Sequence, residues 1–97
     1  MAKVSVYPMV EGGAQVFFFC VGCDEYHAFQ VDAPSGPNWT WNSDEEKPTV
    51  SPSLLVNATL HPERRCHLFV RNGQIQYLAD CWHEFKSQTV DMVESTI

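Results

Sequence analysis

The chain has 97 residues, a net charge of −6 and 44% hydrophobic residues, which is enough apolar material for one small core. A fold of this size buries only about 60–65% of the surface that its unfolded chain exposes, so its core gives marginal stability. Only six residues are Lys or Arg, too few to neutralise phosphates or anionic lipids. We therefore expect a single domain, residues 1–97, that binds neither nucleic acid nor membranes.

The role expected of the four cysteines depends on the compartment that the sequence predicts. The most apolar run, residues 16–21, is far shorter than the span of about 20 residues that crosses a bilayer. The first residues lack the charged and apolar regions of a secretion signal. We expect a cytoplasmic protein, in the host cytoplasm if a phage encodes it. Because structural disulfides are rare there, the cysteines indicate metal ligands.

Hydrophobic periodicity predicts strands along most of the chain and at most one helical turn, within residues 82–87. The predicted strands are, in chain order, residues 15–20, 26–31, a short aromatic segment at 39–42, 54–59, 66–71, 74–80 and a tail strand at 89–93. The expected fold class is therefore mainly β, a small antiparallel sheet, and the cysteines considered below would add stabilisation by zinc.

The clearest local signal is Asn72-Gly73 between two β-rich runs, which predicts a hairpin over residues 66–80 with a type I′ turn. A two-residue loop pairs Arg71 with Gln74 and sets every other pair of the hairpin. Side chains of a strand alternate between its faces. One face is then predicted to carry Cys66, Leu68, Val70, Ile75, Tyr77, Ala79 and, if the strand continues, Cys81. The other face is predicted to carry His67, Phe69, Gln76, Leu78 and Asp80.

The cysteine face predicts a metal site. Cys20 and Cys23 form a Cys-x-x-Cys knuckle, in which Gly22 suits a tight turn. Cys66 and Cys81 would add two thiolates from the hairpin, which would close a structural Cys₄ zinc site. Two histidines are alternates for one of the thiolates: His83 and His27.

The histidine face predicts an imidazole oriented by a carboxylate, because His67 and Asp80 are diagonal neighbours in this register. This pair is the base half of a nucleophilic triad. Ser51 and Ser53 are the candidate nucleophiles. Ser53 is favoured because Pro52 has no N–H for an oxyanion, whereas the N–H of Leu54 is expected to be free.

Trp39, Trp41 and Asn42 form an aromatic and amide cluster with two interpretations. The residues are either ordinary core and surface aromatics or one wall of a peptide-binding cleft. In the second interpretation Asn42 donates to the oxyanion.

The chain resembles a family of small phage and bacterial proteins whose members are sometimes labelled ammonia monooxygenase. The motifs that carry the resemblance are Cys20-x-x-Cys23 with His27, Trp39-x-Trp41-Asn42, Pro48-Thr49-x-Ser51-Pro52-Ser53-Leu54, Cys66-His67-x-Phe69-Val70, and Asp80-Cys81-x-His83. Some members lie beside bacterial genes for ubiquitin-like conjugation and resemble zinc-containing serine peptidases. The resemblance implies a peptidase that uses Ser51 or Ser53 with His67 and Asp80.

Two functions from different classes follow from these observations. The preferred one is a zinc-stabilised serine peptidase or isopeptidase, similar to a deubiquitinase, that acts by acyl transfer on an extended tail of a protein such as a ubiquitin-like protein. The alternative is a non-catalytic zinc module that binds a protein partner through Trp39, Trp41 and the acidic run Asp44-Glu45-Glu46. A hydrolase with a catalytic metal is disfavoured, because the predicted ligands are mostly sulfur.

Overall fold

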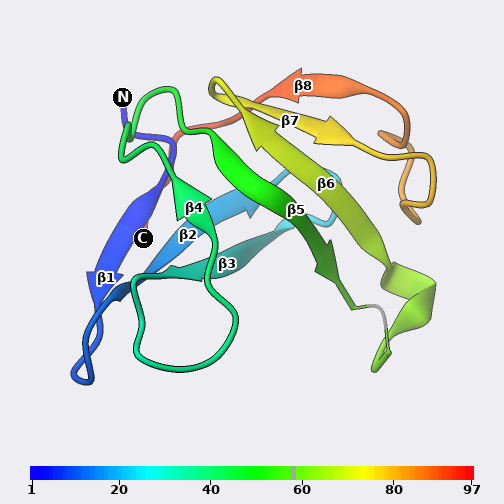
Figure 1. Ribbon diagram of the computed structural model, residues 1–97. Coiled ribbons are helices and arrows are strands. Elements are labelled where there is room, and N and C mark those ends of the chain that lie inside the picture. Colours follow the sequence, from blue (N-terminus) through cyan, green and yellow to red (C-terminus); the bar gives the residue numbers. More distant parts are fainter. Residues whose placement is uncertain (58) are drawn as a thin grey trace.

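Two antiparallel sheets make up the computed structural model, which describes residues 1–57 and 59–97 (Figure 1). The smaller sheet has the order β1-β2-β3, with β1 at Ser5–Pro8, β2 at Ala14–Cys20 and β3 at Glu25–Val31. The larger sheet has the order β4-β5-β6-β7-β8. Its strands are β4 at Thr40–Trp41, β5 at Val50–Val56, β6 at Cys66–Arg71, β7 at Gln74–Tyr77 and β8 at Thr89–Asp91.

The predicted mainly β class is confirmed, although several elements differ in detail. The strand β1 was not predicted; its side chains are largely exposed, and it therefore lacks the apolar alternation that marks a half-buried strand. The strand β5 begins at Val50, four residues before the predicted start, and the predicted end includes Ala58, which lies outside the described residues. The described helical turn is a 3₁₀ turn at Pro62–Arg64, away from the predicted place.

The hairpin of β6 and β7 has the predicted register. Arg71 pairs with Gln74 and Leu68 with Tyr77 across the Asn72-Gly73 turn. Asn72 has φ 49° and Gly73 has φ 77°, as a type I′ turn requires. The strand β7 ends at Tyr77, although the next N–H, of Leu78, still donates to His67 O at 2.9 Å.

The core lies between the inner faces of the two sheets. Every second side chain of β2 is buried, as is every second one of β6, which is the period of two that a half-buried strand shows. The largest fully buried side chains come from both sheets: Tyr77, Phe18, Leu68, Ile75, Val16, Val50 and Val70. The opposite face of β6, which carries His67, remains partly open to solvent.

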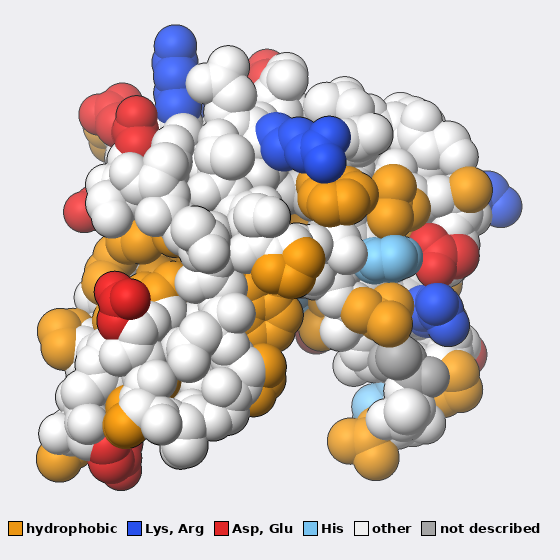
Figure 2. Space-filling view, in the orientation of Figure 1, with side chains coloured by type: hydrophobic (Ala, Val, Ile, Leu, Met, Phe, Trp, Pro, Cys, Tyr) orange, Lys and Arg blue, Asp and Glu red, His pale blue; other side chains and the backbone are white. Residues whose placement is uncertain are grey.

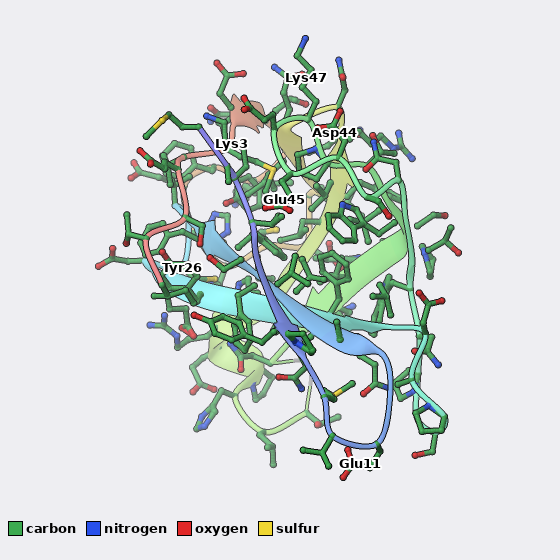
Figure 3. The ribbon with its side chains drawn as sticks, turned by 90° about the vertical axis from the view of Figure 1, so that its left-hand side faces the viewer. Lys3, Glu11, Tyr26, Asp44, Glu45 and Lys47 are labelled. Atoms are coloured by element: carbon green, nitrogen blue, oxygen red, sulfur yellow. The ribbon has the colours of Figure 1, made fainter. Side chains whose placement is uncertain are left out.

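Both ends of the chain lie along the smaller sheet (Figure 3). Near the N-terminus, Lys3 N donates to Glu45 O in the charged loop between β4 and β5. Near the C-terminus, Ser95 N donates to Ala2 O, and Thr96 N donates to the Tyr26 hydroxyl at 3.0 Å. Among the described residues, no helix has the length and apolar character needed to cross a membrane.

Candidate metal centre and Ser-His-Asp site

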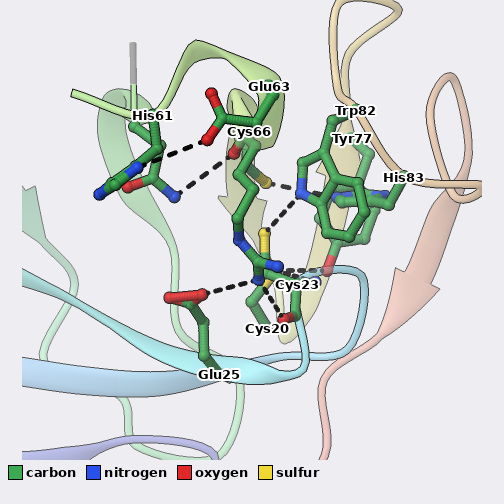
Figure 4. Close-up of polar contacts among 11 residues, drawn as sticks. Cys20, Cys23, Glu25, His61, Glu63, Cys66, Tyr77, Trp82 and His83 are labelled. Carbon is green, nitrogen blue, oxygen red and sulfur yellow. Dashed lines mark hydrogen bonds and ion pairs between the residues drawn. The ribbon is translucent and has the colours of Figure 1, made fainter. Parts of the chain in front are cut away.

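Four potential ligand atoms from both sheets meet at one end of the core. Cys20, Cys23, Cys66 and His83 are all buried, and their ligand atoms lie within 4.8 Å of one another (Figure 4). Cys20 ends β2, Cys23 lies in the turn before β3, and Cys66 opens β6. His83 lies between β7 and β8, and its Nε2 is 3.4 Å from Cys66 Sγ.

The surrounding groups offer hydrogen bonds to two of these sulfurs. Tyr77 OH accepts from Gly22 N at 3.2 Å, which leaves its proton to donate to Cys20 Sγ at 3.1 Å. Cys23 N also donates to Cys20 Sγ, at 3.4 Å, and the Trp82 indole donates to Cys23 Sγ at 3.3 Å. Donors arranged in this way favour sulfur as a thiolate, the form that binds a metal.

Hydrogen bonding and burial shift the pKa values of three of these thiols. The contact with Cys66 contributes most to lowering the pKa of Cys20 to about 3, and the hydrogen bond from Tyr77 lowers it further. The pKa of Cys66 is raised, first by its hydrogen bond to Cys20 and then by burial. Burial also raises the pKa of Cys23, to about 11. A metal ion binds the deprotonated thiolate, so binding releases the protons that the thiols carry.

The spacing of the four ligand atoms fits tetrahedral coordination of a metal ion. Zinc–sulfur bonds of about 2.3 Å place tetrahedral ligand atoms about 4 Å apart, which agrees with the spread of this group. Gly22 permits the close approach, because a Cβ at this position would overlap the imidazole of His83. Three soft thiolates and one imidazole are a donor set typical of zinc.

The fourth predicted cysteine lies outside this group. Cys81 N donates to Leu78 O at 3.3 Å in a turn that follows β7. The turn directs Cys81 Sγ to the main chain of His67, where it accepts from His67 N at 3.3 Å and donates to His67 O at 3.1 Å. The alternate His83 therefore stands beside Cys20, Cys23 and Cys66. His27, the other alternate, is buried and packs edge-on against Phe18 at 5.8 Å.

On the other face of β6, the structure brings Ser53, His67 and Asp80 together. Ser53 Oγ lies 3.0 Å from His67 Nε2, and His67 Nδ1 lies 3.2 Å from Asp80 Oδ2. Both distances are those of hydrogen bonds. The His67 side chain is 25% exposed and that of Asp80 41%, so the imidazole is partly shielded while solvent reaches the site. A hydroxyl, an imidazole and a carboxylate in this order can act as nucleophile, base and orienting group.

Arg65 approaches the same carboxylate. Its Nε and Nη2 each lie 3.1 Å from Asp80 Oδ2, the oxygen that also faces His67. Burial acts to raise the pKa of Asp80, but hydrogen bonds from its own backbone, His67 and Arg65 lower it overall. Asp80 therefore stays ionised beside the imidazole. No pattern in the sequence pointed to this role of Arg65.

The two candidate serines occupy different places on β5. Ser51 pairs with Thr40 of β4 and is exposed, and the β5–β6 pairing shifts between Val50 and Leu54. Ser53, beyond Ser51, contacts His67. The expectation that the N–H of Leu54 is free to bind an oxyanion is wrong. Leu54 pairs with Leu68, and strand alternation turns its N–H toward β6 and away from an incoming carbonyl.

Trp39, Trp41 and Asn42 have different surroundings. The Trp39 indole donates to Ser53 O at 3.3 Å, and both tryptophans pack partly buried against the core. Asn42 organises the charged loop: its Oδ1 accepts from Asp44 N and Thr49 N, and its Nδ2 donates to Lys47 O. Its amide is therefore engaged within residues 42–49.

Three residues around the metal centre were missed in the sequence. Tyr77 and Trp82 contact the sulfurs, and Arg64 lies 4.7 Å above the Trp82 ring. Arg64 also donates to Cys23 O at 3.0 Å and pairs with Glu25 at 2.9 Å. The position of Tyr77 on the cysteine face was a usable signal. The contacts of Arg64 depend on long-range folding.

Comparison with known proteins identifies a family. A family described as bacterial ubiquitination-like system serine protease (BubE) matches residues 1–78. No curated protein and no solved structure matches the chain. The matched region contains Ser53 and His67, whereas Asp80 and His83 follow it in the sequence.

Proposed function

This chain belongs to the family of bacterial ubiquitination-like system serine proteases, and on that premise we propose that it is a zinc-stabilised serine peptidase or isopeptidase. Its substrate in this proposal is an extended protein tail, such as that of a ubiquitin-like protein in the bacterial cytoplasm. The observation that carries the proposal is the continuous contact from Ser53 Oγ through the His67 ring to Asp80 Oδ2.

The reaction in this proposal is acyl transfer. Ser53 Oγ attacks the carbonyl carbon while His67 Nε2 takes the hydroxyl proton, and Asp80 stabilises the imidazolium. His67 then gives this proton to the leaving amine as the carbon–nitrogen bond breaks. Water, deprotonated by His67, hydrolyses the ester on Ser53 and releases the acid.

The metal in this proposal is a structural zinc ion held by Cys20, Cys23, Cys66 and His83. Four protein ligands leave no open position for a water or substrate, as a catalytic zinc ion requires. Bound zinc supplies folding free energy that a core of this size lacks. The chemistry is therefore assigned to Ser53 and His67, on the opposite face of β6.

A serine-directed fluorophosphonate tests the proposal, because the nucleophile displaces fluoride and keeps a covalent phosphonyl adduct. We expect mass spectrometry to locate the adduct on Ser53. Ser53→Ala abolishes labelling, and the matched control Ser51→Ala retains it. An unlabelled wild-type protein, or equal labelling of Ser53→Ala, would favour the non-catalytic zinc module instead.

A further inference from the structure

The strand β5 has an open edge next to Ser53. The short strand β4 pairs with β5 only at Val50 and Ser51, whereas β5 continues to Val56 (Figure 1). Beyond Ser51, no described strand pairs with β5 on the side opposite β6. An unpaired edge offers main-chain donors and acceptors to another extended segment.

The backbone of Leu55 points toward this open side. Leu55 lies opposite His67, whose O accepts from Leu78 N and whose N donates to Cys81 Sγ, both away from β5. In an antiparallel ladder this makes Leu55 and His67 a pair without mutual hydrogen bonds. The N–H and C=O of Leu55 therefore face away from β6. Ser53, two residues earlier, agrees with this, since its O accepts from the Trp39 indole.

The surface beside this edge is hollowed. Figure 2 shows a notch between the lobe that carries the loop of residues 32–39 and the lobe at the end of β5. The side chain of Leu55 is 46% exposed, and it lies on the same face of β5 as Ser53 Oγ. Trp39 occupies the edge at Ser53, so the free stretch begins at Leu55.

We propose that an extended segment of the substrate adds to β5 as a further strand, with main-chain hydrogen bonds to the N–H and C=O of Leu55. This mode of docking rests on the serine peptidase function proposed above. It selects an unfolded, uncharged segment, because the contacts are to the peptide backbone and the adjacent side chain is apolar. Docking in this mode also brings a carbonyl of the segment toward Ser53, which lies where the unpaired part of the β5 edge begins.

Two phosphonate esters that differ in length test this docking. The long probe is the diphenyl phosphonate of acetyl-tetraalanine, and the short probe is that of acetyl-alanine. Ser53 Oγ forms a bond to phosphorus with either probe, and phenol leaves with the proton. Two main-chain hydrogen bonds of ordinary strength predict that the long probe labels Ser53 of the wild-type protein about tenfold faster or more.

Two variants of one residue separate the backbone from the side chain. Leu55→Pro removes the outward N–H and spares the pairing with β6, so the ratio of the long-probe rate to the short-probe rate falls to about one. Leu55→Ala keeps the N–H and keeps a ratio well above one. Both rates of a ratio are measured in the same protein sample. A smaller folded fraction lowers both rates equally and does not change their ratio.

The outcomes distinguish this docking from the proposed function. Labelling of wild-type Ser53 by both probes at equal rates, or equal ratios in Leu55→Pro and Leu55→Ala, would overturn strand addition alone. No labelling by either probe would overturn the peptidase function and the docking with it. If Leu55→Pro does not fold, an N-methylated long probe replaces it: we expect the wild-type ratio to fall to about one, and an unchanged ratio overturns strand addition.

Discussion

One oxygen of Asp80 faces three nitrogen atoms, one from His67 and two from Arg65. Charge-assisted hydrogen bonds of this kind hold a carboxylate in place more firmly than neutral ones. The His67 ring is thereby held with Nδ1 toward Asp80 and Nε2 toward Ser53.

Replacing this carboxylate tests its role at the site. We expect Asp80→Asn to slow fluorophosphonate labelling of Ser53 about 10²- to 10⁴-fold, because a neutral amide neither stabilises an imidazolium nor maintains the required tautomer. The labelling rate and a thermal unfolding curve are measured on the same samples. Glu63→Gln is the control, since its carboxylate is 68% exposed and pairs with His61; an equal loss in both variants would contradict the prediction.

The choice of the fourth metal ligand is tested with two cysteines. We expect Cys66→Ala to lose most of its bound zinc, because Cys66 Sγ belongs to the buried cluster. We expect Cys81→Ala to retain about one zinc ion per chain, because Cys81 Sγ contacts the main chain of His67 instead. Elemental analysis of the purified proteins gives both values. Equal zinc loss in the two variants would restore Cys81 as a ligand.

At the scale of elements, the tight turn between β6 and β7 determines which residues share a face. Gly73 has φ 77°, and a Cβ there would lie 3.2 Å from Glu46 O. Glycine at this position therefore allows both the positive φ of the turn and the close approach of the loop between β4 and β5.

Replacing this glycine is expected to destabilise the fold. Gly73→Ala should lower the free energy of unfolding by about 1–3 kcal/mol, because alanine is strained at positive φ and the loop must shift. Denaturant titration of the zinc-loaded protein measures the change. Gln74→Ala, the neighbouring surface substitution, is expected to stay within about 0.5 kcal/mol of the wild-type protein. Similar values for the two variants would show that the turn tolerates a side chain.

At the scale of the whole molecule, the metal centre joins the two sheets. Cys20 and Cys23 come from the end of β2 and the following turn, whereas Cys66 begins β6 of the other sheet. A bound ion would therefore cross-link two layers whose shared core is small.

Metal removal is expected to unfold the chain and not merely to stop turnover. Chelation at neutral pH should remove the cooperative thermal transition and the near-ultraviolet signal of the tryptophans, and added zinc should restore both. A metal-free protein that keeps its melting temperature would contradict a structural role. Loss of labelling at Ser53 without unfolding would instead indicate a catalytic metal.

Local sequence predicted a large part of the fold and of the candidate site. The Asn72-Gly73 turn predicted the pairs of β6 and β7, and the alternation along β6 separated Cys66 from His67. The preference for Ser53 over Ser51 agrees with the contact to His67, although the N–H of Leu54 is turned the other way. The exposed strand β1 was missed because it carries little periodic signal.

The sequence by itself therefore determined the two-faced hairpin, because turn conformation and side-chain alternation act between neighbouring residues. Only the tertiary structure decided where β7 ends and which side chain stands fourth in the cluster. Tyr77 N donates to Gln88 O, and the turn after Leu78 directs Cys81 to His67 while His83 reaches Cys66. These contacts join residues that are not neighbours along the chain, so the local rules for turns and strand alternation do not set their geometry.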